Sequence, residues 1–489
     1  MIVLVGFMGA GKSTAAREVA GELGATPLDA DALLDERLGT PIEDFFAAHG
    51  EEEFRRREEA LVLELLGRGG DAVVALGGGA VESPRVREAL RDHLTILLDV
   101  DAETSWARVK ASPRPLARDR AAFTALLERR RPLYDEVARW VVPGRRGTAA
   151  RAVRTLGDAD ARMVWATTAS GDYPVVVGAG LRDGPVRGPG TAFVVTDSGV
   201  PREWVGEAQF VLEAGEQHKT LASAEALWRA LAAAGVTRAD HVRAVGGGVV
   251  TDLAGFCAAT YQRGIPVLHV PTTLLAMVDA AIGGKTGVDL PEAKNYVGAY
   301  HQPVGVVADV ETLATLPAPQ RAEGYAEVVK TALIAGGWLW ERVAVGAEVD
   351  EDVVFACART KVAVVAADER DAGARQVLNL GHTVAHALET VTRYALTHGQ
   401  AVGLGLLAAL RLSNQQALRA HVAGLLAAAG LPTTVEGVDV DAVVAATRRD
   451  KKRTGERVPF VLVAAPGDVS PGHTVGDAAL RAAVEELRR

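Results

Sequence analysis

The sequence predicts an α/β protein of two or three domains, with two separate nucleotide-binding segments along the chain. Residues 6–14 read GFMGAGKST and follow an apolar strand at residues 2–5, while three glycines at residues 246–248 follow the apolar run 241–245. Glycine-rich turns between a strand and a helix let backbone N–H groups approach a phosphate closely. The length of 489 residues is sufficient for several separate cores.

The composition excludes several classes of protein. A net charge of -9 with 24% charged residues gives no indication of a nucleic-acid or membrane surface. Cys257 and Cys357, in apolar surroundings, argue against a disulfide scaffold. A strand beginning at Ile2 leaves no room for a signal peptide, and the most apolar run, 401–410, is too short to span a bilayer. We expect a cytoplasmic protein that binds small molecules, without nucleic-acid or membrane partners.

Lysine is rare in this chain. Lysine and arginine together number 53, and only nine are lysines. A lysine in such a background is expected where a compact charge or a tunable pKa is needed, because arginine offers neither. The nine are Lys12, Lys110, Lys219, Lys285, Lys294, Lys330, Lys361, Lys451 and Lys452.

The first glycine-rich turn fits the phosphate-binding pattern G-x4-G-K-[ST], with a helix expected over residues 15–23. Lys12 would reach the outer phosphates and Ser13 would hold Mg²⁺. A purely structural turn is the less favoured interpretation. The expected ATP-binding residues are Gly9, Ala10, Gly11, Lys12, Ser13 and Thr14.

Further motifs follow within the first 157 residues. They are Asp29 and Asp31 after a second strand, EFRRRE at 53–58, a strand at 72–76 ending in glycines 77–79, Arg114-Pro-Leu, and RRRPLY at 129–134. In this order they resemble shikimate kinase over residues 1–157. The same arginines at 55–57 would otherwise fit a solvated helix face.

The resemblance implies a role for each motif residue. Asp29 would lie near Mg²⁺, and Asp31 would accept hydrogen bonds from the substrate hydroxyls. Arg55 and Arg130 would clamp the substrate carboxylate, which suits a guanidinium fork. Gly78 would pack under the substrate ring, and Arg114 would lie on a lid that excludes water.

Two departures from the kinase pattern are visible. Ala75 stands where the family often has a hydroxyl or acid that helps the magnesium ion, and the lid segment 110–113 is short. The adenine-stacking position is therefore open between Arg108 and Lys110. A last helix is expected at 148–156 and a polar linker at 158–163, with a second domain from residue 164.

The second half begins with strands expected at 174–178 and 191–195, the latter running into Asp197 at a strand's carboxyl end. The turn 246–248 is not a G-x-G-x-x-G fingerprint, because Thr251 takes the third glycine's place. Residues 283–286 are not a second phosphate loop, because Asp279 stands where its first glycine would be.

Three of the eleven histidines fall within residues 382–398. His382 and His386 are four apart in a predicted helix, so their rings share one face, and His398 opens a long apolar helix. This pattern suggests a divalent-metal site that needs a further ligand, such as a carboxylate. Core histidines satisfied by backbone carbonyls are the alternative.

A dense motif series surrounds this cluster: YQRG at 261–264, VPTTLL at 270–275, Asp279, GGKT at 283–286, Lys294-Asn295, AEVVKT at 326–331, Lys361, ADER at 367–370, Arg375 and DKK at 450–452. Their order and spacing resemble 3-dehydroquinate synthase over residues 164–489. The implied fold is a P-loop domain with a parallel sheet, like nucleoside monophosphate kinases, then an α/β NAD-binding domain (164–318) and a mostly helical metal- and substrate-binding domain (319–489).

This second resemblance implies a complete site. The metal, zinc or cobalt, would be held by Glu327, His382 and His398, while His386 would hydrogen-bond the reacting group. NAD⁺ would be bound by Asp197, Glu216, Lys219, Gly247, Gly248, Asp252, Thr272, Thr273, Asp279, Lys285, Lys294 and Thr315. The heptulosonate phosphate would be bound by Asp279, Lys285, Asn295, Lys330, Lys361, Arg375, Asn379, His386 and Lys452. Arg263 would reach a neighbouring subunit's substrate, since the family is dimeric.

The two resemblances together predict a bifunctional shikimate-pathway enzyme: ATP-dependent 3-phosphorylation of shikimate, and cyclisation of 3-deoxy-D-arabino-heptulosonate 7-phosphate to 3-dehydroquinate. Three alternatives stay open. They are another sugar-phosphate cyclase, disfavoured by Lys361 and Arg375; a non-catalytic nucleotide-binding regulator, disfavoured by Asp31, Arg55 and Arg130; and a polyol dehydrogenase releasing NADH, disfavoured by the phosphate-binding lysines.

Overall fold

The computed structural model describes residues 1–110, 119–157, 159–181, 184–448 and 458–488, and divides the chain into two compact units, Met1–Trp165 and Ala166–Arg489. Arg114, Lys451 and Lys452 lie outside the described residues. The polar linker expected at 158–163 is shorter in the structure, because its last two residues already belong to a strand, β6.

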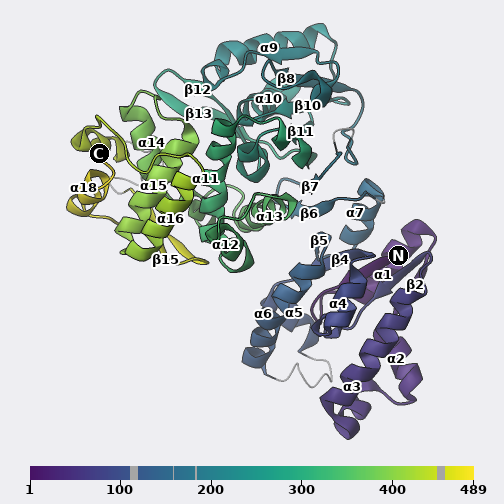
Figure 1. The fold of residues 1–489 in the computed structure, drawn as a ribbon. Helices are drawn as coiled ribbons and strands as arrows, with labels where there is room; N and C mark the ends of the chain where they lie inside the picture. The colour runs from purple at the N-terminus through teal and green to yellow at the C-terminus, as the bar shows by residue number, and fades with distance from the viewer. Residues whose placement is uncertain (111–118, 158, 182–183, 449–457, 489) are drawn as a thin grey trace. The chain divides into compact units, whose positions relative to one another are not determined.

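The first unit is a parallel sheet with helices (Figure 1). Its strand order is β2-β3-β1-β4-β5-β6. Its strands are β1 (Ile2–Val5), β2 (Thr26–Asp29), β3 (Ala72–Ala75), β4 (Leu94–Asp99), β5 (Trp140–Pro143) and β6 (Arg162–Thr167). Its helices are α1 (Lys12–Leu23), α2 (Ala30–Leu38), α3 (Ile42–Gly67), α4 (Pro84–Leu90), α5 (Ala102–Val109), α6 (Arg120–Val137) and α7 (Thr148–Leu156). The central strands β1 and β3 are continuous apolar runs because a parallel sheet is covered on both faces.

Strand β1 lies between β3 and β4, so the loop that follows it opens at the carboxyl edge of the sheet centre. Helix α1 begins after Gly11, which adopts φ 93° and provides no side-chain cap. The first N–H groups of α1 are thus left for a ligand. The predicted strand at 2–5 and helices at 15–23 and 148–156 are all present.

The second unit contains another parallel sheet, in the order β7-β14-β11-β10-β8-β9. These strands are β7 (Asp172–Gly178), β8 (Ala192–Asp197), β9 (Phe210–Leu212), β10 (His241–Gly246), β11 (Val267–Pro271) and β14 (Gly305–Asp309). With them are the helices α8 (Arg202–Val205), α9 (Leu221–Ala233) and α10 (Gly248–Thr260) and an antiparallel hairpin of β12 (Lys285–Leu290) and β13 (Ala293–Tyr300). The strands expected at 174–178, 191–195 and 241–245 are present.

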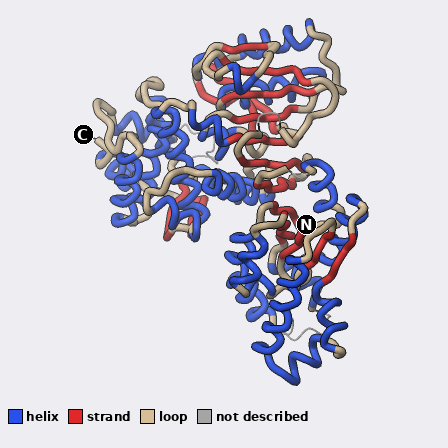
Figure 2. Tube along the Cα trace, turned by 45° about the vertical axis from the view of Figure 1, so that its right-hand side comes forward, coloured by secondary structure: helices blue, strands red, loops and turns tan. Residues whose placement is uncertain are grey.

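The rest of this unit is almost wholly helical (Figure 2). It comprises α11 (Ala318–Ala335), α12 (Gly337–Ala344), α13 (Glu351–Ala367), α14 (His382–Val391), α15 (His398–Leu412), α16 (Gln416–Ala428), α17 (Val440–Thr447), α18 (Asp477–Glu485) and a hairpin of β15 (Phe460–Ala465) and β16 (Asp468–His473). Within the described residues, no helix combines the length and hydropathy that a membrane span needs.

Helix α15 is the centre of this helical part, buried from Ala401 to Leu410. Glycines allow its close packing. A Cβ on Gly405 would overlap the carbonyl oxygen of Gly381 before α14, and a Cβ on Gly399 would overlap the backbone of Glu323 in α11. These close approaches bring the first residues of α14 and α15 next to α11.

Candidate active sites

A cleft of about 2100 Å³ lies in the second unit. One wall is the carboxyl edge of the sheet, with Asp197 at the end of β8, Gly247 after β10 and Thr272 after β11. The opposite wall is formed by helices, including the starts of α14 and α15. A ligand in this cleft would therefore touch both the parallel sheet and the helical part.

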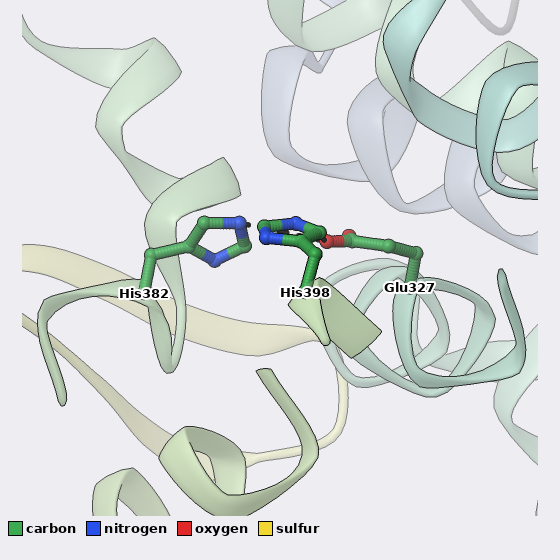
Figure 3. Close-up of side chains that lie close together, drawn as sticks. All are labelled: Glu327, His382 and His398. Atoms are coloured by element: carbon green, nitrogen blue, oxygen red, sulfur yellow. Dashed lines mark hydrogen bonds and ion pairs between the residues drawn. The ribbon is translucent and has the colours of Figure 1, made fainter. Parts of the chain in front are cut away.

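Three side chains from three helices converge beside this cleft (Figure 3). Oε1 of Glu327 in α11 lies 3.5 Å from Nε2 of His382 and 3.3 Å from Nε2 of His398. All three candidate ligand atoms lie within 4.8 Å of one another. Carboxylate and imidazole donors at such distances fit a divalent ion of the zinc or cobalt type.

The charges of this cluster also suit a cation. Burial opposes ionisation of Glu327, but the ion pair with Lys330 and the hydrogen bonds from His382 and His398 together hold the pKa of this carboxyl well below its usual range. Burial lowers the pKa of His382 to about 4. Burial opposes the charged form of His398 too, yet hydrogen bonding to Glu327 and Glu389 raises its pKa to about 10. A bound cation would replace the proton on Nε2 of His398.

The alternative, that these are core histidines hydrogen-bonded to backbone carbonyls, explains only one of the two ring nitrogens of His382. Nδ1 of His382 lies 3.1 Å from the Leu380 carbonyl oxygen, which fixes that ring and leaves Nε2 facing Glu327. Ligating histidines are commonly held in this way through their other nitrogen. His386 stands beside the cluster, with its ring centroid 5.5 Å from that of His382, and lines the cleft. Sequence spacing alone predicts the pair His382 and His386, whereas the structure groups His382 with His398 and Glu327.

Next to the cluster is a group of buried cations. Nζ of Lys361 donates to Asp279 Oδ1 and to the Asp279 carbonyl, both at 2.6 Å. Burial lowers the pKa of Lys361 to about 8 in spite of this partner. Lys330 lies 3.9 Å from the same carboxylate, and Arg375, only 1% exposed, donates to the carbonyl of Gly283 at 2.9 Å.

The sheet side of the cleft carries alternating charges. Nζ of the buried Lys219 lies 3.1 Å from Glu216 and 3.2 Å from Asp252. Burial raises the pKa of Asp252 to about 6 although Lys219 opposes this. Helix α10 begins after Gly247 with no side-chain cap, so its N–H groups face the cleft region as those of α1 do in the first unit.

The first unit has its own pocket, of about 310 Å³. Its lining includes the predicted residues Gly9, Gly11, Lys12, Ser13, Thr14, Asp29, Asp31 and Gly78. Nζ of Lys12 donates to the carbonyls of Gly6 at 2.8 Å and Phe7 at 3.2 Å. Arg108 also lines the pocket and donates to the Gly9 carbonyl at 2.9 Å, whereas Lys110 is not among the lining residues.

Two arginines predicted to bind a carboxylate are held by glutamates. Arg130, 2% exposed, donates to Glu82 at 3.1 Å and 3.2 Å, and Arg55 donates to Glu58 at 2.6 Å. A Cβ on Gly79 would overlap the Arg55 guanidinium. Gly77 likewise leaves room for the Glu58 and Asp31 side chains, so two glycines of this turn are needed by the polar side chains that pack against them.

Comparison with known proteins identifies both parts. Family models for the N-terminal and C-terminal regions of 3-dehydroquinate synthase match residues 209–323 and 324–453, and the shikimate kinase model matches residues 8–159. The 3-dehydroquinate synthase of Symbiobacterium thermophilum is 43% identical over 351 residues, covering 65% of this chain and 98% of its own. The chain belongs to the 3-dehydroquinate synthase family. It joins this synthase to a shikimate kinase domain, as expected for a bifunctional shikimate-pathway enzyme.

Other relatives agree. The 3-dehydroquinate synthase of Caulobacter vibrioides is 45% identical over 294 residues, covering 56% of this chain and 79% of its own. Among solved structures, 2-deoxy-scyllo-inosose synthase complexed with carbaglucose-6-phosphate, NAD⁺ and Co²⁺ is 26% identical, with a TM-score of 0.57 over 66% of this chain and 99% of its own. ValA, the 2-epi-5-epi-valiolone synthase of Streptomyces hygroscopicus with NAD⁺ and Zn²⁺, is 27% identical, with a TM-score of 0.59 over 64% and 96%.

The cleft of the synthase collects most residues predicted for it. All twelve expected NAD-binding residues line it, from Asp197 to Thr315. So do those expected substrate-binding residues that the structure describes. Arg263 is not on this lining. It is exposed after α10, with φ 68°, and its reach into a partner's site stays a prediction, as do the roles of Arg114 and Lys452.

Several polar residues of the two sites were not singled out from the sequence. Glu58 follows Arg55 by one helical turn, and this spacing predicts their ion pair. Glu82, Asp371 and Glu389 gave no such signal, because their partners Arg130, Lys285 and His398 are distant in the chain or on other elements.

Proposed function

We propose that this chain catalyses both reactions of its two families. The synthase half would convert 3-deoxy-D-arabino-heptulosonate 7-phosphate to 3-dehydroquinate with release of phosphate, and the kinase half would phosphorylate shikimate at its 3-hydroxyl with ATP and Mg²⁺. The observation that carries the synthase assignment is the triad Glu327, His382 and His398 beside a cleft that also holds buried cations and a glycine-rich turn.

In the synthase half, residues 164–318 would hold NAD⁺ and residues 319–489 most of the metal and substrate contacts. When bound, the metal, zinc or cobalt, would act as a Lewis acid toward substrate hydroxyls, and NAD⁺ would serve as hydride acceptor. Glu327, His382 and His398 would hold the metal. His386 would hydrogen-bond the reacting oxygen from the cleft wall.

The cations have two tasks in this proposal. Lys285 and Lys330, with Asn295 and Asn379, would surround the phosphate and ring of the substrate. A phosphate that leaves as an anion is stabilised by fixed positive charge in a partly dry cleft. Lys361 and Arg375 would bind the substrate carboxylate. Because burial weakens the hold of Lys361 on its proton, a bound carboxylate would also restore its charged form.

In the kinase half, Lys12 would stabilise charge on the transferring phosphoryl group, with Ser13 and Asp29 near Mg²⁺. Asp31 would accept the substrate hydroxyls. Arg55 and Arg130 would exchange part of their contacts with Glu58 and Glu82 for the shikimate carboxylate. Arg108 is our choice for the residue that contacts adenine, because it already lies against the P-loop.

Related cyclases that share this fold have other names, so the substrate of the synthase half must be tested by experiment. Inosose and valiolone synthases share the fold at 26% and 27% identity, while 3-dehydroquinate synthases reach 43% and 45%. The carboxylate partners Lys361 and Arg375 also favour the heptulosonate phosphate. We further propose a cytoplasmic homodimer formed through the synthase half, with Arg263 reaching the partner's substrate.

The test measures two products from one purified protein. Phosphate release from the heptulosonate phosphate, with NAD⁺ in catalytic amounts, should yield 3-dehydroquinate, and ADP should form only when shikimate is present. Turnover of a hexose 6-phosphate in place of the heptulosonate would assign the synthase half to another cyclase. NADH released in proportion to product would instead indicate a dehydrogenase.

A further inference from the structure

Glu389 joins two parts of the synthase cleft. It lies in the last turns of α14 and is 3% exposed. Its Oε1 is 3.4 Å from Nδ1 of His398 and 3.3 Å from Nζ of Lys294. The other ring nitrogen of His398 faces Glu327, so Glu389 contacts this candidate ligand from the side opposite the triad.

We infer that Glu389 is a positioning residue that couples the metal site to the nucleotide site, by holding His398 for the metal and Lys294 for the nucleotide. The inference rests on the proposed function, because it assumes that the triad takes a metal ion and that the sheet side of the cleft takes NAD⁺. Neither the metal triad nor the expected nucleotide-binding set includes Glu389.

The contact with His398 determines which nitrogen is free. An imidazole that binds a metal through Nε2 keeps a proton on Nδ1. A carboxylate that accepts a hydrogen bond from this N–H group fixes both the tautomer and the ring orientation. His382 uses the Leu380 carbonyl for the same purpose. The Leu380 carbonyl is fixed in the backbone, so a ligand elsewhere in the cleft does not move it. The Glu389 side chain, in contrast, also contacts a second group.

That second group is Lys294 on β13. Its Nζ lies 4.9 Å from the ring centroid of Tyr394 and 3.9 Å from Glu216 Oε1, which in turn is 3.1 Å from Lys219. A line of alternating charges thus runs from His398 through Glu389, Lys294 and Glu216 to Lys219, which pairs with Asp252 of α10. A lysine side chain has considerable rotamer freedom. Because Glu389 already holds the end of Lys294 in place, binding of the nucleotide costs less side-chain conformational entropy.

Positioning and simple charge predict different results for one substitution. If Glu389 acted only through its charge, its removal would weaken binding of a cation and strengthen binding of an anionic pyrophosphate. If it positions His398 and Lys294, Glu389→Gln should weaken both. We expect Co²⁺ affinity to fall about 10- to 100-fold, as for other partners of ligating histidines, and NAD⁺ affinity to fall at least about fivefold.

The experiment measures binding in the full-length chain, without turnover. Co²⁺ affinity is obtained by competition with a chromophoric chelator, with the visible Co²⁺ spectrum as a readout of ligand geometry, and NAD⁺ affinity by calorimetry with and without Co²⁺. Glu389→Asp keeps the charge but shortens the reach, so it should lose both affinities as well. In Lys294→Met, adding Glu389→Gln should change NAD⁺ affinity no further.

The matched control is Glu486→Gln. Glu486 also bridges two cations, Arg411 at 2.6 Å and Arg419 at 3.1 Å, and it is not among the lining residues of the cleft. Its variant should bind Co²⁺ and NAD⁺ as the wild type does. A rise in NAD⁺ affinity in folded Glu389→Gln, or wild-type affinities in Glu389→Asp, would overturn the inference. A wild-type chain that binds neither Co²⁺ nor NAD⁺ would overturn the proposed function itself.

Discussion

Gly405 of α15 packs directly against the backbone of Gly381, so closely that a Cβ on Gly405 would overlap the Gly381 carbonyl oxygen. Gly381, at φ 79°, is also the residue before α14. The two glycines set the distance between the helices that begin with His382 and His398. The metal triad therefore depends on a helix contact more than one turn away from His398.

Gly405→Ala is expected to destabilise the synthase half and weaken metal binding. Overpacking against backbone typically lowers the free energy of unfolding by about 1–3 kcal/mol. The measurements are the thermal midpoint and the content of bound zinc or cobalt. Gly424→Ala in α16 is the control, because a Cβ on Gly424 would meet nothing within 4 Å and a helical alanine should be neutral or slightly stabilising. Equal effects of the two substitutions would contradict the close-packing explanation.

Removal of the metal should separate the two activities. A chelator should abolish phosphate release, while ADP formation should persist once excess Mg²⁺ is supplied. His386→Ala should retain the metal but slow turnover, because His386 is outside the triad. Metal content is measured by atomic emission on the purified variants. A metal-free but folded His386 variant would show that the ligands have been assigned wrongly.

The affinity of the synthase for its substrate should depend on the protonation of Lys361. Burial lowers the pKa of Lys361 to about 8, so its charge is present below this pH and is lost as the pH rises through it. A carboxylate partner needs the charged form, and kcat/KM should therefore fall above about pH 8. In Lys361→Arg the guanidinium stays charged, so this alkaline fall should move to higher pH even if the maximum is lower. An unchanged alkaline limb in that variant would assign the titration to another group.

Gly79→Ala should impair shikimate binding in particular. The added methyl group would overlap the end of the Arg55 side chain, which can move, so function should suffer more than stability. KM for shikimate should rise about tenfold or more, as for loss of one charge-assisted contact, while KM for ATP stays within about twofold. Gly67→Ala at the end of α3 has open space around it and should leave both constants unchanged.

The two halves are expected to work independently, because each forms a compact unit of its own. Lys12→Ala should remove shikimate-dependent ADP formation, an effect worth several kcal/mol in comparable phosphoryl-transfer sites. It should leave 3-dehydroquinate formation within about a factor of two. His382→Ala should do the reverse. Loss of both activities from one substitution, in a protein shown to be folded, would establish coupling between the halves.

Local features of both units could be predicted from the sequence. The strand at 2–5, the loop at 6–14 and the helix behind it are encoded by neighbouring residues, since an apolar run and glycines at fixed spacing specify them without help from the rest of the chain. The same holds for the strands at 174–178 and 241–245. The motif order from residue 261 to residue 398 also predicts the synthase family without any tertiary contact.

The geometry of the metal triad was decided only by the tertiary structure. Spacing placed His382 and His386 on one helix face, but the carboxylate of Glu327 and the ring of His398 reach His382 through the packing of three helices. The resemblance implies these three ligands, while the reason they meet lies in the close contacts of Gly405 with Gly381 and of Gly399 with Glu323. The pairs Glu82–Arg130 and Glu389–Lys294 also cannot be predicted from local sequence patterns. Their partners are far apart in the chain and meet only because of the tertiary fold.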